Sequence, residues 1–315
     1  MNYQYILQRL LLAMLVIVGV TIAVFLIIQL IPGDPARVSL GLQATDELVA
    51  QRRENMGLNR PILVQYGSWA TNALQGDFGR SLITGHPVSE TLVQRLPTTL
   101  QLAGLALIFG MIVAFPLGII SALRPNSFMD IVASLLSQLG VAVPDFWMGI
   151  LLVLLFSSTL DWLPPSGYTP ITENFVDWLR HMILPALTAG LISASIQTRF
   201  IRSAMLDVMS QNYIQTARAK GLKERVVITR HALRNALITI VTIVGLQMTA
   251  LLSAVVVIEI VFNLPGLGRL ALDAVLDRDY TLLQGAVFVM ALLVTFINLS
   301  IDLTYFFLDP RVEHA

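Results

Sequence analysis

Six long apolar runs dominate the pattern of hydrophobic and polar positions along this chain of 315 residues. A helix needs about 20 mostly apolar residues to cross the roughly 30 Å of hydrocarbon in a bilayer. Each run meets this length, and together they cover residues 10–30, 97–122, 130–157, 182–203, 235–262 and 281–308. The pattern predicts an all-α polytopic membrane protein with six transmembrane helices.

Proline and glycine fall inside several of these runs, where we expect interruptions of the helix at Pro116, Gly118, Pro144, Pro185 and Gly190. Such breaks are tolerated in a helical bundle because neighbouring helices or water satisfy the freed backbone groups. The fourth run also carries three consecutive small residues, which permit close helix approach: Ser193, Ala194 and Ser195.

The long polar segment after the first run has the character of a soluble cap. Two prolines, Pro32 and Pro35, end the first helix. Helix-compatible stretches follow at residues 45–56 and 61–74, and a glycine-rich turn spans residues 76–79. We therefore predict four parts: an N-terminal transmembrane helix (1–31), a large periplasmic loop (32–96), a five-helix core (97–308) with a cytoplasmic loop at 204–235, and a cytoplasmic tail (309–315).

The loop between the fourth and fifth runs is strongly basic. Eight Lys and Arg residues but only two acidic residues lie between Arg199 and Arg234. Short basic loops stay on the cytoplasmic side of a membrane. With the amino terminus inside, the inner segments hold eleven basic residues and the two short outer loops hold three. The sequence thus predicts a multi-pass protein with both termini in the cytoplasm.

Local chemistry divides this basic loop into two short helices that meet at Lys220, Gly221 and Leu222. Gly221 suits the left-handed position that ends a helix, because without a Cβ it avoids about 1–2 kcal/mol of strain. Lys220 complements the negative end of the helix dipole. Such a helix pair, joined to membrane helices on both sides, can move as a rigid body.

Composition excludes several classes of protein. The chain is 56% hydrophobic and 13% charged, against about 25% charged residues in soluble domains. Its formal net charge is zero, so nothing favours nucleic acid as a partner, whereas membrane lipid is expected. There is no Cys, the four His lack ligand spacing, and no Gly-Lys phosphate loop or hydrolase motif occurs. We predict a non-enzyme without catalytic residues, a metal site or a bound cofactor.

A series of motifs resembles the permease subunits of ABC importers in the dipeptide, oligopeptide and nickel group. The cytoplasmic loop carries ARAKGL followed by HALRNA, and the other matches are YILQRL, PGDPA, GDFGRS, WLPPSGY, FNLPGLGR and LDPR, in the family's order. The resemblance spans nearly the whole chain. It implies the type I importer bundle in the bacterial inner membrane, importing substrate by alternating access.

The resemblance also implies partners and a site. The partners are a second homologous permease, two ATP-binding subunits that use ATP and Mg, and a periplasmic substrate-binding protein. The residues expected to contact the ATPase are Gln215, Thr216, Ala217, Arg218, Ala219, Lys220, Gly221, Leu222, His231, Arg234 and Asn235. Two departures from the general pattern stand out. Gln215 and Thr216 replace Glu and Ala, and Arg234 follows Leu233 where other importers have Leu-Pro.

Other interpretations remain open at this point. The basic loop could bind anionic lipid, and a gradient-driven secondary transporter would share many apolar helices, although no internal repeat supports it. Glu259, Pro265, Gly266 and Gly268 form a possible periplasmic gate, while Asn298 and Asp302 favour interhelical hydrogen bonding. The substrate stays undecided among dipeptides, oligopeptides, glutathione and nickel chelates, with peptides preferred.

Overall fold

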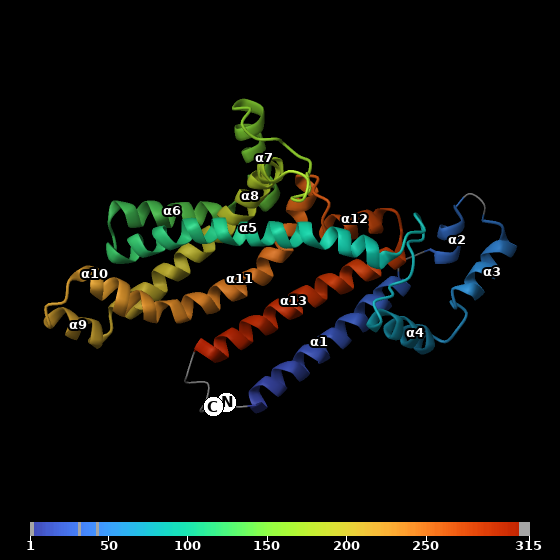
Figure 1. Cartoon of the computed structure of the whole chain (residues 1–315), viewed down its shortest axis with the longest axis horizontal. Coiled ribbons are helices and arrows are strands. Elements are labelled where there is room, and N and C mark those ends of the chain that lie inside the picture. The colour runs from blue at the N-terminus through green and yellow to red at the C-terminus, as the bar shows by residue number, and fades with distance from the viewer. Residues whose placement is uncertain (1–2, 31–32, 42–43, 309–315) are drawn as a thin grey trace. The chain divides into compact units, whose positions relative to one another are not determined.

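The computed structural model describes residues 3–30, 33–41 and 44–308, and every regular element in these ranges is helical. The described chain forms two compact units (Figure 1). Unit 1 holds residue 3, residues 100–264 and residues 297–308, and unit 2 holds the rest. Three predictions fall wholly or partly outside the described residues: the end of the first helix at residues 31–32, most of the LDPR motif, and the tail at 309–315.

Unit 1 is built on the long helix α8 (Phe175–Met209), which packs against α6 and α11. Helix α8 starts where the Asn174 side chain accepts hydrogen bonds from the backbone N–H groups of Val176 and Asp177, which caps the helix. The unit's other elements are the second part of α5 (Val88–Leu123), α6 (Phe128–Ala142), α7 (Asp145–Val153), η2 (Leu154–Thr159), α9 (Asn212–Ala219), α10 (Glu224–Val226), η3 (Val227–Ala232), α11 (Leu233–Val261) and the end of α13 (Tyr280–Leu308).

Unit 2 surrounds a small apolar core formed by the start of α5, helix α12 and the first half of α13. Val88, Leu92 and Leu267 are buried there, and Phe78 packs against them. A second layer is aromatic, because Trp69 lies against Phe288, with ring centroids 5.9 Å apart. The unit's elements are α1 (Tyr3–Leu30), α2 (Pro35–Leu40), α3 (Asp46–Asn55), α4 (Ile62–Leu74), α12 (Leu267–Leu276) and parts of α5 and α13.

Within the described residues, five helices are long and apolar enough to cross a membrane, and a bent pair makes a sixth if it is counted as one span. The pair is α6 with α7 and η2, and its two halves meet at an angle of 106°. Pro144 lies at this break and precedes α7. Figure 1 shows α7 turning away from α6. The prediction of a helix interruption at Pro144 is therefore confirmed.

The other predicted interruptions are wrong. Helix α5 runs unbroken from Val88 to Leu123 through Pro97 and Pro116, and α8 continues through Pro185. Helix α5 begins at Val88, earlier than the predicted apolar run at residue 97, because its first turns before Pro97 are polar but still helical. Pro116 and Pro185 lie in helices that pack against neighbouring helices, and this packing outweighs the local tendency of proline to end a helix.

The glycines in these helices serve close packing instead of interruption. A Cβ on Gly140 of α6 would lie 1.9 Å from the Ser195 hydroxyl oxygen of α8. A Cβ on Gly190 of α8 would lie 2.9 Å from the backbone oxygen of Ala106 in α5. Larger side chains at either position would force the helices apart. The predicted close approach at Ser195 is thus confirmed.

The cap prediction agrees with the described helices of unit 2. Helix α3 starts after Thr45, whose hydroxyl accepts a hydrogen bond from the Leu48 backbone N–H, and α4 starts after Pro61. Both elements match the predicted stretches to within a residue or two. The short helix α2, capped by the Asp34 carboxylate, follows the first apolar helix and was not predicted.

Candidate coupling segment and polar clamp

The predicted ATPase-contacting residues all lie in the coupling segment, which we define as residues 204–235. It comprises the end of α8, then α9, α10, η3 and the first turn of α11. Figure 1 places α9 and α10 beside each other at one end of the long helices α8 and α11 of unit 1. The segment therefore connects two membrane-length helices directly, without a long flexible linker.

The turn after α9 has the predicted backbone conformation. Gly221 has φ of +75°, and its N–H donates to the Arg218 carbonyl at 2.9 Å. The Leu222 N–H reaches back to the Ala217 carbonyl at 3.4 Å. This pair of bonds is the Schellman arrangement, in which a left-handed residue ends a helix. No atom lies within 4 Å of a Cβ built on Gly221, so only backbone strain disfavours a side chain there.

The second half of the coupling segment differs from the prediction of two separate short helices. Helix α10 has only three residues and continues through the π-helical turn η3 into α11. The side chain of Lys223 provides no cap hydrogen bond at its start, which agrees with the absence of a Ser or Thr. Any force applied at this point thus passes straight into α11.

Buried apolar side chains anchor the coupling segment to unit 1. Ile214 and Ala217 of α9, and Val227 of η3, are buried in one cluster with residues of α5, α8 and α11. Ile201 and Met205 of α8 belong to the same cluster. Because this anchor is continuous with the bundle core, the segment and the adjoining helices form one packed body.

The opposite face of the coupling segment is open to solvent. Leu222, directly after the turn glycine, is 40% exposed. Of the predicted contact residues, Ala217 is buried and His231 is half-buried, while the rest are exposed: Gln215, Thr216, Arg218, Ala219, Lys220, Gly221, Leu222, Arg234 and Asn235. The segment thus presents a polar face with one apolar side chain at its turn.

An ion pair spans the Gly221 turn. Nη2 of Arg218 lies 2.6 Å from Oε1 of Glu224, and its Nε donates to Oε2 at 3.2 Å. These hydrogen bonds raise the pKa of the Arg218 guanidinium above its ordinary value. Asn235 fixes the other end, because its Nδ2 donates to the Tyr213 hydroxyl at 2.9 Å. Side chains on both sides of the turn therefore hold the two halves together.

A buried polar clamp joins α5, α6 and α8 close to the coupling segment. Nε and Nη2 of Arg202 donate to the two carboxylate oxygens of Asp130 at 2.7 and 2.8 Å. The Ser121 hydroxyl also donates to Asp130, and the Asn126 backbone N–H donates to it at 2.8 Å. Asp130 is only 4% exposed, so this paired charge lies inside the bundle.

The residues of the predicted gate divide between the two units. Glu259 is fully buried near the end of α11 in unit 1, and its backbone carbonyl accepts a hydrogen bond from the Leu264 N–H at 2.8 Å. Pro265, Gly266 and Gly268 belong to unit 2, where Gly266 precedes α12. Glu259 was expected at the membrane interface, and its complete burial is compatible with a structural or gating role.

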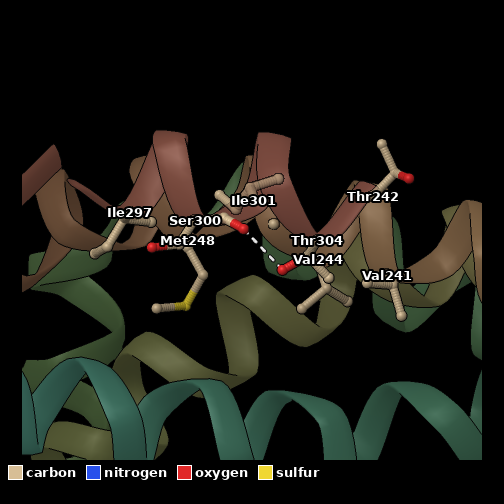
Figure 2. A pocket seen from close by; sticks show the side chains of 9 residues that line it. Val241, Thr242, Val244, Met248, Ile297, Ser300, Ile301 and Thr304 are labelled. Atoms are coloured by element: carbon tan, nitrogen blue, oxygen red, sulfur yellow. Dashed lines mark hydrogen bonds between the residues drawn. The ribbon is translucent and has the colours of Figure 1, made fainter. Parts of the chain in front are cut away.

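The groove between α11 and α13 in unit 1 is apolar (Figure 2). It has a volume of about 290 Å³ and is lined by aliphatic, Met and Thr or Ser side chains. Gly245 brings the helices together, because a Cβ there would lie 2.5 Å from Cγ2 of Ile301. Thr249 donates a hydrogen bond to Oδ1 of Asn298 at 2.7 Å, which confirms the predicted interhelical bond for Asn298.

Two regions of the chain, which together span most of its length, match known protein families. Residues 114–314 match the family described as binding-protein-dependent transport system inner membrane component, and residues 2–103 match the N-terminal region of such membrane components. The chain belongs to this family. It is a permease subunit of the ABC importer type, and within the described residues its helical content agrees with that assignment.

Individual relatives of the permease are similar over nearly their whole length. It is 42% identical over 309 residues to a putative peptide transport system permease of Brucella suis, covering 98% of each chain. It is 41% identical over 310 residues to the glutathione transport system permease of Salmonella choleraesuis, covering 98% of this chain and 99% of the relative. The fold is shared with an inward-facing structure of the MetNI methionine ABC transporter, with a TM-score of 0.57 at 15% identity, over 70% of the permease and 96% of that chain.

Sequence reasoning predicted the glycine turn of the segment at residues 204–235 but missed the polar clamp. Arg202 was counted only as a basic residue of the cytoplasmic loop, and Asp130 only as the start of a span. The one available signal for the clamp was an acidic residue, Asp130, at the start of an apolar run. Its partner Arg202 lies 72 residues away in the sequence. No group of three or more His, Asp or Glu residues that could hold a metal ion occurs in the part of the chain that the structure describes.

Proposed function

We propose that the permease forms half of the translocation pathway of an ATP-driven importer, which carries di- or oligopeptides across the bacterial inner membrane by alternating access. Its partners are then a second homologous permease, two ATP-binding subunits that use ATP and Mg, and a periplasmic substrate-binding protein. Both termini and the coupling segment face the cytoplasm, and the loop at residues 32–96 faces the periplasm. The permease itself binds no cofactor and catalyses no reaction.

The architecture of the coupling segment carries this proposal. Its buried face is continuous with the packing of α5, α8 and α11, while its polar face and Leu222 remain exposed. A partner that binds the exposed face can therefore move the bundle as a packed body. Closure of the ATP-binding subunits would supply that movement, and the absence of any phosphate loop in the sequence makes a separate motor necessary.

The substrate class rests on the relatives, one of which is named for peptides and another for glutathione. Glutathione is itself a small peptide, so the two names describe one chemical class with a peptide bond and free carboxylates. Glutathione is the second candidate substrate, supported by 41% identity to that relative. Competition between a labelled dipeptide and glutathione for uptake would separate the two substrates.

The periplasmic gate stays a prediction, and we state it separately for the residues of each unit. Glu259 is proposed to line the outer end of the pathway in unit 1. The segment with Pro265, Gly266 and Gly268 is proposed as a rigid turn that positions α12 in unit 2. Support comes from the position of Glu259 near the end of α11 and from the hydrogen bond that the Leu267 backbone N–H donates to the Thr99 hydroxyl at 2.9 Å.

The decisive experiment is ATP-driven uptake by the purified complex in proteoliposomes. We expect stoichiometric ATP-binding subunits to copurify with the permease, and uptake of a labelled dipeptide to require ATP and the binding protein. Uptake that persists without the ATP-binding subunits and follows a proton gradient would contradict the proposal.

A further inference from the structure

The cap in unit 2 contains a cavity that the coupling mechanism does not use. Its volume is about 610 Å³, within the range of roughly 300–1,000 Å³ typical of small-molecule sites. Its walls come from the end of α1, residues 53–60, α4, the glycine-rich turn at residues 77–79 and the first turns of α13. These segments all belong to the same compact unit.

Two buried side chains in the cavity wall have donors without partners. Tyr280 is 4% exposed and Gln284 is 8% exposed, and both line the cavity. Within the described residues, the Tyr280 hydroxyl and Nε2 of Gln284 make no hydrogen bond. Buried polar groups are rarely left in this state, because desolvation without a replacement partner is costly. Nε2 of Gln284 can only donate, so its missing partner must offer an acceptor, and the Tyr280 hydroxyl can donate to the same partner.

The charges of the cavity wall favour an anionic group. Arg53 and Arg60 are its two cationic residues, and Asp77 is its one carboxylate. Arg53 lies 3.4 Å from the Asp34 carboxylate, and Asp77 accepts a hydrogen bond from the Gly79 N–H at 2.8 Å. Arg60 is exposed and makes no ion pair within the described ranges, and arginine binds carboxylates in a bidentate manner.

Part of the remaining wall is aromatic, and the rest mixes apolar residues with neutral polar ones such as Gln65 and Asn72. Phe25, Trp69 and Phe78 line the cavity, and the rings of Phe25 and Trp69 lie 6.4 Å apart. An organic ligand with an acidic end matches this combination of aromatic rings, neutral polar groups and cationic side chains. The backbone of Gly33 passes close to the buried hydroxyl of Tyr280, since a Cβ at residue 33 would lie 2.5 Å from it.

We propose that this cavity binds the carboxylate end of a short peptide, with Arg60, Tyr280 and Gln284 as its hydrogen-bond donors. The choice of a peptide rests on the proposed function, while the carboxylate chemistry rests on the cavity alone. The permease would then select free acids independently of any binding protein.

Binding is measured on the full-length permease in lipid nanodiscs, with whatever partners copurify, and without ATP or binding protein. The probes are alanyl-alanine and its C-terminal amide. Wild type should prefer the acid by about tenfold, which is the scale of one hydrogen bond to a charged group. Absence of binding, or equal binding of acid and amide, would overturn the proposal.

The variants separate a ligand site from a structural role. Arg60→Met should remove the preference for the acid, whereas the matched control Arg52→Met, which lies outside the cavity wall, should retain it. Tyr280→Phe and Gln284→Met should each weaken binding of the acid about tenfold without lowering the thermal stability of the empty protein, because each deletes an unpartnered donor. Loss of stability in the empty Tyr280→Phe protein, or unchanged binding, would refute the assignment.

The two proposals fail in different ways. If ATP-driven uptake is absent but alanyl-alanine binds and depends on Arg60, the importer proposal fails and the cavity site stands. If uptake proceeds and the cavity variants bind the acid as wild type does, the site is wrong and the importer stands.

Discussion

Asp130 in unit 1 and Asp279 in unit 2 are both buried carboxylates at the start of a helix, but they are stabilised differently. Asp130 accepts two hydrogen bonds from the Arg202 guanidinium, in addition to those from Ser121 and Asn126. Asp279, 2% exposed, has only neutral donors among the described residues, which are the Ser81 hydroxyl and the backbone N–H groups of Leu82 and Leu282.

This difference separates two ways to hold a fold together. At Asp279 the N-terminus of α13 and backbone N–H groups are enough to stabilise the carboxylate, so the site depends on the position of the backbone. At Asp130 the charge comes from α8, a separate helix, so the site couples the packing of three helices. The clamp lies where movement of the coupling segment would enter the bundle, and the Asp279 site fastens the cap to α13.

Removal of the clamp's cation should have the largest effect. Arg202→Met leaves the Asp130 carboxylate buried without its counter-charge, and we expect the free energy of unfolding to fall by about 3 kcal/mol. This is the lower end of the usual range because the Arg202 side chain is 30% exposed. Equilibrium unfolding in mixed micelles measures the change. Arg199→Met, at an exposed position one turn earlier, serves as the control.

The same Asp→Asn change at both carboxylates sharpens the comparison. In Asp130→Asn the new amide faces the Arg202 guanidinium, donor against donor, and about 2 kcal/mol should be lost. In Asp279→Asn the carbonyl keeps the two backbone N–H groups and the Ser81 hydroxyl can turn, so we expect a loss of about 1 kcal/mol or less. Equal losses in the same unfolding measurement would show that the charge at Asp130 is irrelevant.

The apolar runs predicted the membrane helices because bilayer thickness fixes their length, whatever packs beside them. The turn at Gly221 was also predictable, since its signal is the local chemistry of a single glycine. The course of α5 through Pro97 and Pro116 was not, because neighbouring helices determine whether a proline ends a helix. Local signals thus succeeded where the backbone responds to nearby residues alone.

Long-range polar pairs lay beyond sequence reasoning. Ser81 and Asp279 are 198 residues apart, and nothing in either segment indicates the other. The cavity donors Tyr280 and Gln284 were likewise inconspicuous, because a Tyr and a Gln near the start of an apolar run usually mark the membrane interface. Only their burial without partners distinguishes them.

Gly221 extends the comparison to a site that depends on backbone conformation and on no charge. Gly221→Val should destabilise the turn by about 1–2 kcal/mol, because the left-handed conformation disfavours a branched side chain. We expect substrate-stimulated ATP hydrolysis by the assembled complex to drop several-fold while membrane insertion is unchanged. Gly221→Asn is the matched control, since Asn tolerates this conformation and should retain coupling. Equal stimulation in the Val variant and wild type would contradict the coupling role.

The smallest effect is expected at Arg218 and Glu224, which repeat the clamp's guanidinium–carboxylate geometry in water. Their closest contact is 2.6 Å, slightly shorter than that of Arg202 with Asp130, but both side chains are about half exposed. Solvent screening should make their coupling free energy far smaller than that of the buried clamp, and a double-mutant cycle with Arg218→Ala and Glu224→Ala measures it. The coupling free energy of this pair should also fall as salt is raised, whereas that of the Arg202–Asp130 pair should not. A coupling at Arg218 as large as that of the buried clamp would mean that burial does not decide the strength of these pairs, and the contrast drawn from Asp130 would fail.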